Sequence, residues 1–521
     1  MQNIKKILIA NRGEIALRIN ATCHALNIQT IGVYAPEDMY LSYVYKVDQA
    51  YLLSQAGINA YLNQEEIIEI ALQTHTDAIH PGYGFLSENA IFAQKVIDAG
   101  LIWIGPDPQT LALTAHKTDA KNFVEKLGIP IVPGFHINGA QDEQKPETNN
   151  LASAHQIAHK IGFPVILKDP LSGGGKAMKL VHNQETLEIA WDSVQRESKK
   201  LTNSQQIIIE KYLQNPRHIE IQIAGDGQHA IHLYERECSI QRRHQKIIEE
   251  APCQFIPQET KEALYDTATI IANNLKYKNL GTIEFLVMPD QSFYFLEINP
   301  RLQVEHSITE ITTGLDLVAL QIEIAQTGKL PVQQEQITQK MHAIECRIYS
   351  EDPANNFFPS TGLIDLLSLP HGPFIRHEHD LSENMLITSD FDPMLSKLIT
   401  HGPDRACAIG HMKEALNNFI IAGVTTNISF LKALLNSPDY ISGNFSTQFL
   451  HDKTKIDVLL KTYEDKVRNC AHAELVEAST AFSQEEIAAI VTLISEIKQQ
   501  KPVQKAPQIQ DNKRWKQQVW E

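Results

Sequence analysis

Cysteine is scarce in this sequence and forms no recognisable pattern. Six cysteines are spread singly over 521 residues, without a CxxC pair or a dense framework. This spacing predicts neither a zinc site nor disulfide bonds, and it favours a reducing compartment, the cytoplasm. Apolar runs are short as well, since none approaches the ~18–20 residues of a membrane span, and the N-terminal residues leave no room for a signal peptide. We expect a cytoplasmic protein without a membrane partner.

Positive charge is also in deficit. Lysine and arginine number 46 against 62 aspartate and glutamate residues, a formal net charge of −16. A chain this acidic would repel a phosphate backbone, so a nucleic-acid partner is not expected. Hydrophobic residues make up 43% of the chain and charged residues 21%. These values predict a globular protein of about three domains.

Two common nucleotide-binding fingerprints are missing. The first expected strand, at 6–10, is followed by NRGEIA rather than GxGxxG, so no nicotinamide or flavin dinucleotide is predicted. The Walker pattern GxxxxGK[ST] is absent too. Short apolar runs nevertheless alternate with helix-like segments at 64–74 and 88–98; the runs lie at 6–10, 30–35, 77–80 and 101–105. This alternation predicts βαβ units and a parallel, Rossmann-like sheet.

The pattern along the chain predicts a multidomain protein of the α/β and α+β classes. We expect a Rossmann-like N-terminal domain over 1–112, a central domain over 113–339, a mixed α+β domain over 340–450 and a tail over 451–521. The α+β domain has strand signals at 342–350, 362–369 and 374–379, then helical stretches around 404–419 and 429–435. The tail has an amphipathic helix near 484–498 and then a segment rich in Gln, Lys and Pro.

The stretch FLEINPRLQVEH at 295–306 concentrates charged side chains behind an apolar start. Residues on a strand alternate between its faces. Alternation would place Phe295, Glu297 and Asn299 on one face, and Leu296 and Ile298 on the other.

The strand before this stretch carries a further glutamate, Glu284. A symmetric two- or four-residue hairpin loop within 289–292 would set Glu284 opposite Glu297, with Cβ atoms about 4.5–5.5 Å apart. Facing carboxylates need a positive partner, and Mg²⁺ bound with nucleotide phosphates suits two glutamates and Asn299. The alternative is a pair of surface glutamates on a solvated hairpin.

A glycine segment, SGGGK at 172–176, directly follows an expected strand and offers bare backbone N–H groups to a phosphate. Lys168 at the end of that strand and Lys117 at the start of the central region add positive charge. Alone, the segment could equally be a flexible surface loop. The next triplet, AMK at 177–179, is similar to the biotin-attachment sequence of carrier domains, but it runs into KLV rather than a tight hairpin, so we interpret the likeness as chance.

A basic cluster, QRRHQK at 241–246, stands out in an acidic chain. As a nucleic-acid patch it is short and has no interleaved aromatics. A salt-bridged surface loop is one interpretation, and a basic lining for a small anion beside a nucleotide is the other.

Several of these stretches together resemble the biotin carboxylase family of ATP-grasp enzymes. The similar stretches are KILIANRGEIALRI (6–19), HPGYGFLSENA (80–90), EKYLQNPRHIEIQI (210–223), CSIQRRHQKIIEEAP (238–252), FLEINPRLQVEH (295–306) and HAIECRIYSEDP (342–353). They stand in the expected order and cover about 4–450. The resemblance implies an ATP-grasp central domain with a mobile lid over about 134–209, and ATP-dependent carboxylation of biotin by bicarbonate through carboxyphosphate.

The resemblance also implies roles for individual residues. ATP would be bound by Lys117, Lys168, Gly173, Gly174, Gly175, Glu210, Lys211, Leu213, His218, Gln241 and His244, and Mg²⁺ or Mn²⁺ by Glu284, Glu297 and Asn299. Bicarbonate would be bound by Lys246, Arg301, Gln303 and Val304 and deprotonated by Glu305. Biotin would contact Tyr83 and Arg347, and Arg347 would stabilise its enolate-like form. Arg301 and Lys246 also suit this chemistry because they offset the charge of two anions brought together.

The partners follow from the same resemblance. No convincing biotin-attachment or carboxyltransferase region is found, so biotin is expected on a separate biotin carboxyl carrier protein, with carboxyltransferase subunits and a homodimeric state. The chain would then be the biotin carboxylase subunit of a multi-subunit carboxylase, acetyl-CoA carboxylase of fatty acid biosynthesis first among the candidates. The alternatives are a degenerate nucleotide-binding scaffold subunit and another ATP-grasp ligase that joins a carboxylate to an amine.

The glycine segment departs from the family pattern. The family usually has Lys-Ala and then four or five glycines, whereas this chain reads KDPLSGGGKAM at 168–178. Pro170 removes a backbone donor, and Asp169 brings a negative charge next to Lys168. We predict a stiffer lid and a higher KM for ATP than in a variant with the glycines restored. Steady-state kinetics on both forms checks this, and equal KM values would contradict it.

Overall fold

The N-terminal region is a parallel sheet with helices on its faces. The computed structural model describes residues 3–135, 151–169, 177–203, 207–243 and 245–466. Strands β1 (Lys6–Ile9), β2 (Gln29–Tyr34), β3 (Gln49–Leu52), β4 (Ala78–His80) and β5 (Ile102–Trp103) lie in the order β3-β2-β1-β4-β5, all pairs parallel. The expected Rossmann-like layer is confirmed. The half-exposed edge strand β3 was not predicted, because its sequence QAYL carries no apolar run.

Strand β1 shows why the strands of this region consist of successive apolar residues. Ile7 and Ile9 lie in the core on one side of the sheet and Leu8 in the core on the other. A strand buried on both faces needs apolar side chains at successive positions. Helices of this region are α1 (Gly13–Ala25), α2 (Ser42–Lys46), α3 (Gly57–Leu62), α4 (Gln64–Gln73), α5 (Ala90–Asp98) and α6 (Pro108–Ala115).

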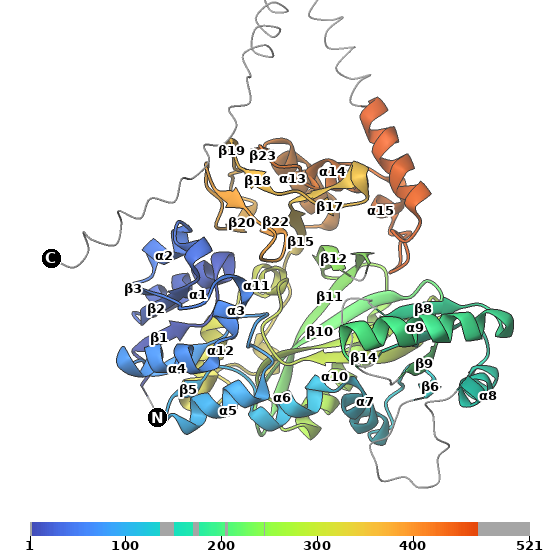
Figure 1. The fold of residues 1–521 in the computed structure, drawn as a ribbon, viewed down its shortest axis with the longest axis horizontal. Helices are drawn as coiled ribbons and strands as arrows, with labels where there is room; N and C mark the ends of the chain where they lie inside the picture. The colour runs from blue at the N-terminus through green and yellow to red at the C-terminus, as the bar shows by residue number, and fades with distance from the viewer. Residues whose placement is uncertain (1–2, 136–150, 170–176, 204–206, 244, 467–521) are drawn as a thin grey trace, which may run out of the picture. The chain divides into compact units, whose positions relative to one another are not determined.

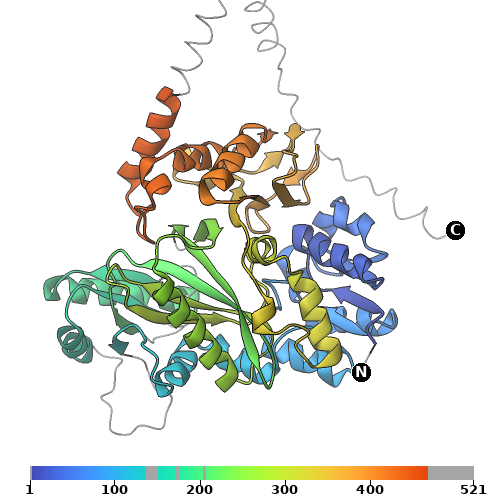
Figure 2. The same ribbon diagram turned by 180° about the vertical axis from the view of Figure 1, so that it is seen from behind.

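The central feature is a long antiparallel sheet (Figure 1). Its order is β14 (Phe293–Asn299), β13 (Lys278–Val287), β10 (Arg217–Asp226), β11 (Ala230–Arg242), β12 (Gln245–Ala251), β15 (His342–Tyr349), β22 (Met394–Gly402) and β20 (Ile375–His379). The sheet therefore continues across residue 340, since β12 pairs with β15. Helix α10 (Gln258–Asn274) packs Leu264 and Ile271 against Ile219 of β10, on the face seen in Figure 2.

A smaller sheet carries the strand before the glycine segment. Its order is β6 (Gly134–Phe135), β9 (Ile208–Lys211), β7 (Val165–Lys168) and β8 (Met178–Val181). Helices α8 (Leu151–Ile161) and α9 (Leu187–Leu201) pack on it, with Trp191 against Val165 and Leu167. Helix α7 (Lys117–Lys126) begins at one of the predicted lysines.

The third region confirms the expected strands and helices. Short strands β16 (Glu351–Asp352), β17 (Phe358–Pro359), β18 (Gly362–Leu363), β19 (Leu366–Ser368), β21 (Leu386–Ile387) and β23 (Ile420–Ala422) accompany α13 (Arg405–Asn417), α14 (Ile428–Leu435) and α15 (Pro438–Ser442). Helices α11 (His306–Thr313) and α12 (Leu317–Thr327) precede this region. The described part of Met1–Leu460 is one compact unit, and the helix expected near 484–498 lies outside the described residues. Each described helix is too short or too polar to cross a membrane.

The hairpin of β13 and β14 pairs Glu284 with Glu297 as predicted, but its loop differs from the predicted one. Val287 pairs with Phe293, so the connection spans 288–292, an odd number of residues instead of the expected two or four. That loop alone would bring Leu296 opposite Glu284. A β-bulge beside Glu284 and Phe285 adds one residue to β14 and restores the pairing of Glu284 with Glu297.

The bulge also changes which side chains share a face. Phe295 is fully buried and lies in the core with Ile298, while Leu296 lines the cleft with Glu297 and Asn299. The expected placement of Phe295 beside Glu297, and of Leu296 beside Ile298, was wrong. Strict alternation fails because a bulge sets two successive residues on one side of the strand.

This exchange of faces predicts different costs for two neighbouring truncations. Phe295→Ala should lower the free energy of unfolding by about 3–5 kcal/mol, because it empties a close-packed core position. Leu296→Ala should cost less than half as much, because its side chain already borders the cleft. Urea unfolding midpoints of both variants check the prediction, and a larger effect at Leu296 would contradict it.

Candidate active site

Most of the predicted site residues line one cleft. It has a volume of about 1440 Å³, and its wall includes Tyr83, Lys117, Lys168, Glu210, Lys211, Leu213, His218, Gln241, Lys246, Glu284, Glu297, Asn299, Arg301, Gln303, Val304 and Arg347. Glu305 has no exposed surface and contacts residues of this wall. Gly173, Gly174, Gly175 and His244 lie outside the described residues.

A row of glutamates crosses the sheet at the cleft. Glu220 of β10 pairs with Glu284 of β13, which pairs with Glu297 of β14. Side chains at directly opposite positions lie on the same face, where like charges repel. Glu220 was not predicted, although the alternation in RHIEIQI places it on the same face as His218. Strand period alone could therefore have identified it.

Lys246 of β12 contacts two glutamates of this row and also Glu305, the predicted base for bicarbonate. Its Nζ lies 2.5 Å from Glu220, 2.9 Å from Glu284 and 2.7 Å from Glu305. Burial alone would lower the pKa of Lys246, but the three carboxylates raise it well above its ordinary value. Burial alone would raise the pKa of Glu284, but Lys246 and His218 hold it well below its usual range. Lys246 thus stays charged and keeps Glu284 ionised.

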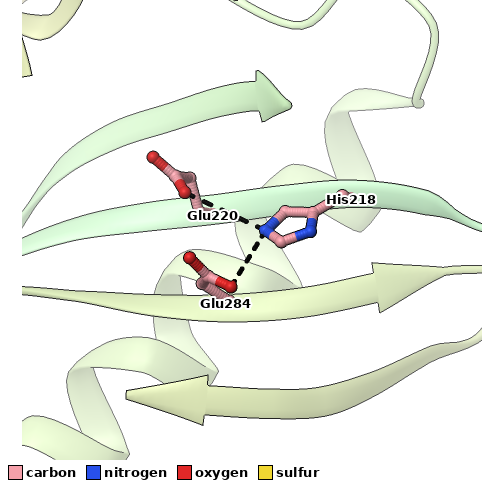
Figure 3. A group of neighbouring side chains, drawn as sticks. All are labelled: His218, Glu220 and Glu284. Atoms are coloured by element: carbon pink, nitrogen blue, oxygen red, sulfur yellow. Dashed lines mark ion pairs between the residues drawn. The ribbon is translucent and has the colours of Figure 1, made fainter. Parts of the chain in front are cut away.

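The predicted metal ligands offer oxygen atoms, and basic side chains lie beside their two carboxylates. Glu284 also accepts a hydrogen bond of 2.9 Å from Asn299 Nδ2 and lies 3.1 Å from His218 Nε2 (Figure 3). Glu297 is 2.9 Å from Nζ of Lys117, a lysine whose side chain is 43% exposed. Carboxylate and amide oxygens suit a hard divalent cation, and the exposed Lys117 is free to exchange Glu297 for a phosphate. The residues therefore fit Mg²⁺ or Mn²⁺ bound together with nucleotide phosphates.

Glu305, which follows β14 in the chain, lies close to two cationic side chains. Glu305 precedes the first residue of α11, and its carboxylate lies 2.7 Å from Lys246 and 2.8 Å from the Arg347 guanidinium. Burial alone would raise the pKa of Glu305, but Lys246 and Arg347 lower it well below its ordinary value. Arg347 also donates to Glu249 at 2.6 Å. Glu305 is thus an ionised carboxylate between two cations.

Arg301 and Gln303 form a second pair of polar groups on the cleft wall. Arg301 donates to Glu88 at 2.5 Å and to Gln303 Oε1 at 2.9 Å. Gln303 Nε2 lies 3.4 Å from Glu284. These contacts link the guanidinium predicted to bind bicarbonate with the carboxylate predicted to bind metal.

On the nucleotide side, Glu210 lies between two lysines. Lys168 donates to it at 2.5 Å, and Lys121 of α7 makes a second ion pair with it. Burial alone would raise the pKa of Glu210, but the two ammonium groups hold it well below its usual range. Burial, opposed by Glu210 and reinforced by Lys168, lowers the pKa of Lys121 to about 8. Lys121 was not predicted, because nothing in the helix pattern distinguishes it from a solvated lysine.

Lys211, Leu213 and Gln241, which are predicted to bind ATP, also contact other parts of the chain. The Lys211 ammonium donates to the carbonyls of Gly162 at 2.9 Å and Phe163 at 3.0 Å, so it caps the end of α8. The Leu213 carbonyl accepts from Gln448 at 2.8 Å. Gln241 lies 3.0 Å from His218 Nδ1 and donates to the Cys238 carbonyl at 2.8 Å.

Asp169 does not direct its charge at Lys168 as its position in the sequence suggests. It is 2% exposed and accepts from Ser198 at 2.8 Å and Thr202 at 2.5 Å, on α9 and just after it. Its effect on the described residues is therefore to attach the end of β7 to α9.

Arg242 of the basic cluster pairs with Glu351 and lies over the Phe357 ring, 4.2 Å from its centroid. Within the cluster, Gln241 and Arg242 end β11, and Gln245 and Lys246 begin β12.

A small sheet facing a larger antiparallel sheet, with lysines and the predicted metal-ligand carboxylates lining the cleft, defines an ATP-grasp protein. The family models described as "Biotin carboxylase, N-terminal domain", "Carbamoyl-phosphate synthase L chain, ATP binding domain" and "Biotin carboxylase C-terminal domain" match residues 3–111, 116–333 and 345–452. A biotin carboxylase of Halalkalibacterium halodurans is 43% identical over 454 residues, 87% of this chain and 98% of that protein. A pyruvate carboxylase of Pichia angusta is 42% identical over 87% of this chain, which spans 38% of that protein.

A solved structure agrees. The biotin carboxylase domain dimer of Hydrogenobacter thermophilus 2-oxoglutarate carboxylase, in complex with MgADP, ADP and bicarbonate, has a TM-score of 0.83 and 37% identity. The match covers 88% of this chain and 99% of that one. The chain belongs to the biotin carboxylase family, whose members use ATP to carboxylate biotin.

The position of Lys121 predicts how ATP binding depends on pH. Above about pH 8, Lys121 loses its proton and no longer competes with Lys168 for the Glu210 carboxylate. Lys168 is then neutralised more fully, so KM for ATP should rise. In Lys121→Arg the guanidinium stays protonated, and the rise should disappear from that pH range. KM for ATP as a function of pH checks this, with Lys126→Arg on the exposed face of α7 as control. Identical profiles for wild type and Lys121→Arg would contradict it.

Proposed function

We propose that the chain is the biotin carboxylase subunit of a multi-subunit carboxylase. It would use ATP and bicarbonate to carboxylate the biotin of a separate biotin carboxyl carrier protein, as a homodimer that works with carboxyltransferase subunits. The final acceptor would be acetyl-CoA. The observation that carries the proposal is the single ammonium group of Lys246 between Glu284 and Glu305, because it joins the metal site to the base.

ATP would be held by the lysines on the cleft wall. Lys117 and Lys168 each have one carboxylate partner on this wall, Glu297 and Glu210. A phosphate group competes for both ammonium groups and releases Glu297 toward the cation. When bound, Mg²⁺ or Mn²⁺ would neutralise phosphate charge, with Glu284, Glu297 and Asn299 as its protein ligands. Glu210 would stay paired with Lys121.

Bicarbonate would be bound by Arg301, Gln303, Lys246 and the Val304 backbone. Its negative charge competes with Glu305 for Lys246, so the pKa of Glu305 rises as the substrate enters. Glu305 then accepts the proton of the bicarbonate O–H group. The freed oxygen attacks the γ-phosphorus, the bond from that phosphorus to the bridging oxygen breaks, and ADP leaves with the electron pair. The product of this step is carboxyphosphate.

Biotin would be carboxylated in the same cleft. The carbon–oxygen bond of carboxyphosphate breaks to give CO₂ and phosphate, and this phosphate takes the proton from the biotin ureido N–H. The deprotonated nitrogen bonds to the CO₂ carbon. Arg347 would hold the enolate-like ureido oxygen, since its guanidinium lies between Glu249 and Glu305 and next to the site of proton transfer. Tyr83 would contact the biotin ring.

The alternatives lack this support. A scaffold subunit would not need Glu305 buried between two cations, and another ATP-grasp ligase would not need Arg347 on the base. The acceptor is proposed from the relatives whose whole length this chain matches. The chain covers 98% of two proteins named biotin carboxylase, from Halalkalibacterium halodurans and Bacillus subtilis. Other relatives are named pyruvate carboxylase and methylcrotonoyl-CoA carboxylase.

ADP release by the purified chain tests the reaction. It should require bicarbonate and increase with free biotin. Glu305→Gln should lower kcat about 10²- to 10⁴-fold, the range for loss of a general base, with KM for ATP within about twofold. Glu323→Gln, an exposed glutamate on α12, is the matched control. ADP release that is independent of bicarbonate, or unchanged in Glu305→Gln, would contradict the proposal.

The acceptor is read out with labelled bicarbonate. The native complex is incubated with ATP, ¹⁴C-bicarbonate and acetyl-CoA, pyruvate or methylcrotonoyl-CoA in turn. Acid-stable label in malonyl-CoA is expected. Label that forms only with another acceptor would assign the chain to a different carboxylase while leaving its own reaction intact.

A further inference from the structure

We infer that Lys397 is a positioning residue for the carboxylation reaction: its buried ammonium group holds the Val304 carbonyl, and through it Glu305, beside Tyr83. The inference rests on the proposed function, because the roles of these neighbours do. Lys397 is on β22, about ninety residues beyond the bicarbonate motif, and it is 0% exposed.

The contacts of Lys397 join segments that are distant in the sequence. Its Nζ donates to the Val304 carbonyl at 2.8 Å and lies 2.6 Å from Glu378 of β20. The same atom is 3.5 Å from Glu14, near the start of α1, and 5.7 Å from the centroid of the Tyr83 ring. One ammonium group therefore contacts the NRGE motif, the loop expected to meet biotin and the segment expected to bind bicarbonate.

The sheet places Lys397 next to a predicted biotin-contact residue. It pairs with Arg347 of β15 on one side and with Glu378 of β20 on the other. Arg347 holds the Glu305 side chain at 2.8 Å, while Lys397 holds the carbonyl of the residue before it. Adjacent cations on neighbouring strands thus fix both the backbone and the side chain of the predicted base.

A buried ammonium group is a rigid anchor because moving it is costly. An ion removed from water is tolerated only where charged and polar partners replace its hydration. Glu378, the Val304 carbonyl and Glu14 supply these partners for Lys397. Glu378 in turn accepts from Ser307 of α11 at 2.9 Å. Lys397 and Glu378 therefore hold Val304 and Ser307, which lie on the two sides of Glu305 in the chain.

Glu14 depends on this cation in particular. Both of its carboxylate oxygens are buried and accept no hydrogen bond from the residues that the structure describes, and Lys397 is the cation within 4.0 Å among them. Burial raises the pKa of Glu14 to about 7 even beside Lys397. Without Lys397 it would therefore be a buried carboxyl group that must take up a proton or stay uncompensated, whereas Glu378 would keep its ion pair with Arg376. A variant that removes both the ammonium group and the Glu14 charge therefore separates loss of positioning from loss of folding.

The experiment compares Lys397→Met, Lys397→Arg and the double variant Lys397→Met with Glu14→Gln. In Lys397→Met we expect KM for bicarbonate and for free biotin to rise about 10- to 100-fold, as when a reacting group is displaced, and KM for ATP to stay within about twofold. Lys397→Arg should recover part of the loss, and the double variant should keep the same pattern as Lys397→Met. Lys261→Met, which removes a lysine 2.8 Å from Glu235 away from the cleft, is the matched control.

Amide hydrogen exchange gives a readout that does not need activity. Peptides covering 301–306 should exchange faster in Lys397→Met and in the double variant than in wild type or Lys261→Met. Unchanged exchange at 301–306 overturns the inference, whatever the kinetics. A parallel rise of all three KM values, or an unchanged KM for bicarbonate, also overturns it. If wild type releases no ADP in response to bicarbonate, the proposed function fails, and exchange alone decides the role of Lys397.

Discussion

The repulsion within a row of three carboxylates is the constraint around which the site is built. Glu220, Glu284 and Glu297 occupy successive positions across β10, β13 and β14, on the face that borders the cleft. Cations from other parts of the chain neutralise this negative charge. Arg236 contacts Glu220 at 2.5 Å, Lys246 bridges Glu220 and Glu284, and Lys117 contacts Glu297. Lys246 and Lys117 also bring β12 and α7 to the cleft wall.

Lys246 makes the two halves of the site depend on each other. Its contacts with Glu284 and Glu305 place the predicted metal ligand and the predicted base around one ammonium group. A substrate anion that takes up this ammonium group weakens its hold on both carboxylates at once. In the proposed reaction, the predicted base would gain proton affinity when bicarbonate binds, and the same exchange would free Glu284 for the cation. Burial makes the coupling strong, since the charges are little screened by water.

Local sequence patterns predicted much of the fold and part of the site. Apolar runs identified β1, β2, β4 and β5 because strands buried on both faces carry continuous apolar residues. The pairing of Glu284 with Glu297 was also expected, but the structure reaches it through an odd loop and a bulge rather than a symmetric two- or four-residue loop. A bulge has no reliable sequence signal, so the side of Phe295 and Leu296 could not be read. Lys121 and Lys397 were missed for a related reason: their importance lies in partners far along the chain. Glu220 was missed although the alternation in its own strand could have identified it.

The sequence by itself determined the kinds of residue that the site contains and their local order. Alternation in FLEINPRLQVEH predicted Glu297 and Asn299 on one face of a strand, as the structure has them, whereas the helix start beside Glu305 was not predicted. Only the tertiary structure decided which charges meet. Lys246 lies 59 residues from Glu305, Lys121 lies 89 residues from Glu210, and Lys397 lies 93 residues from Val304. Electrostatic interactions act through space, so a spacing along the chain does not reveal a counter-ion that another strand or helix supplies.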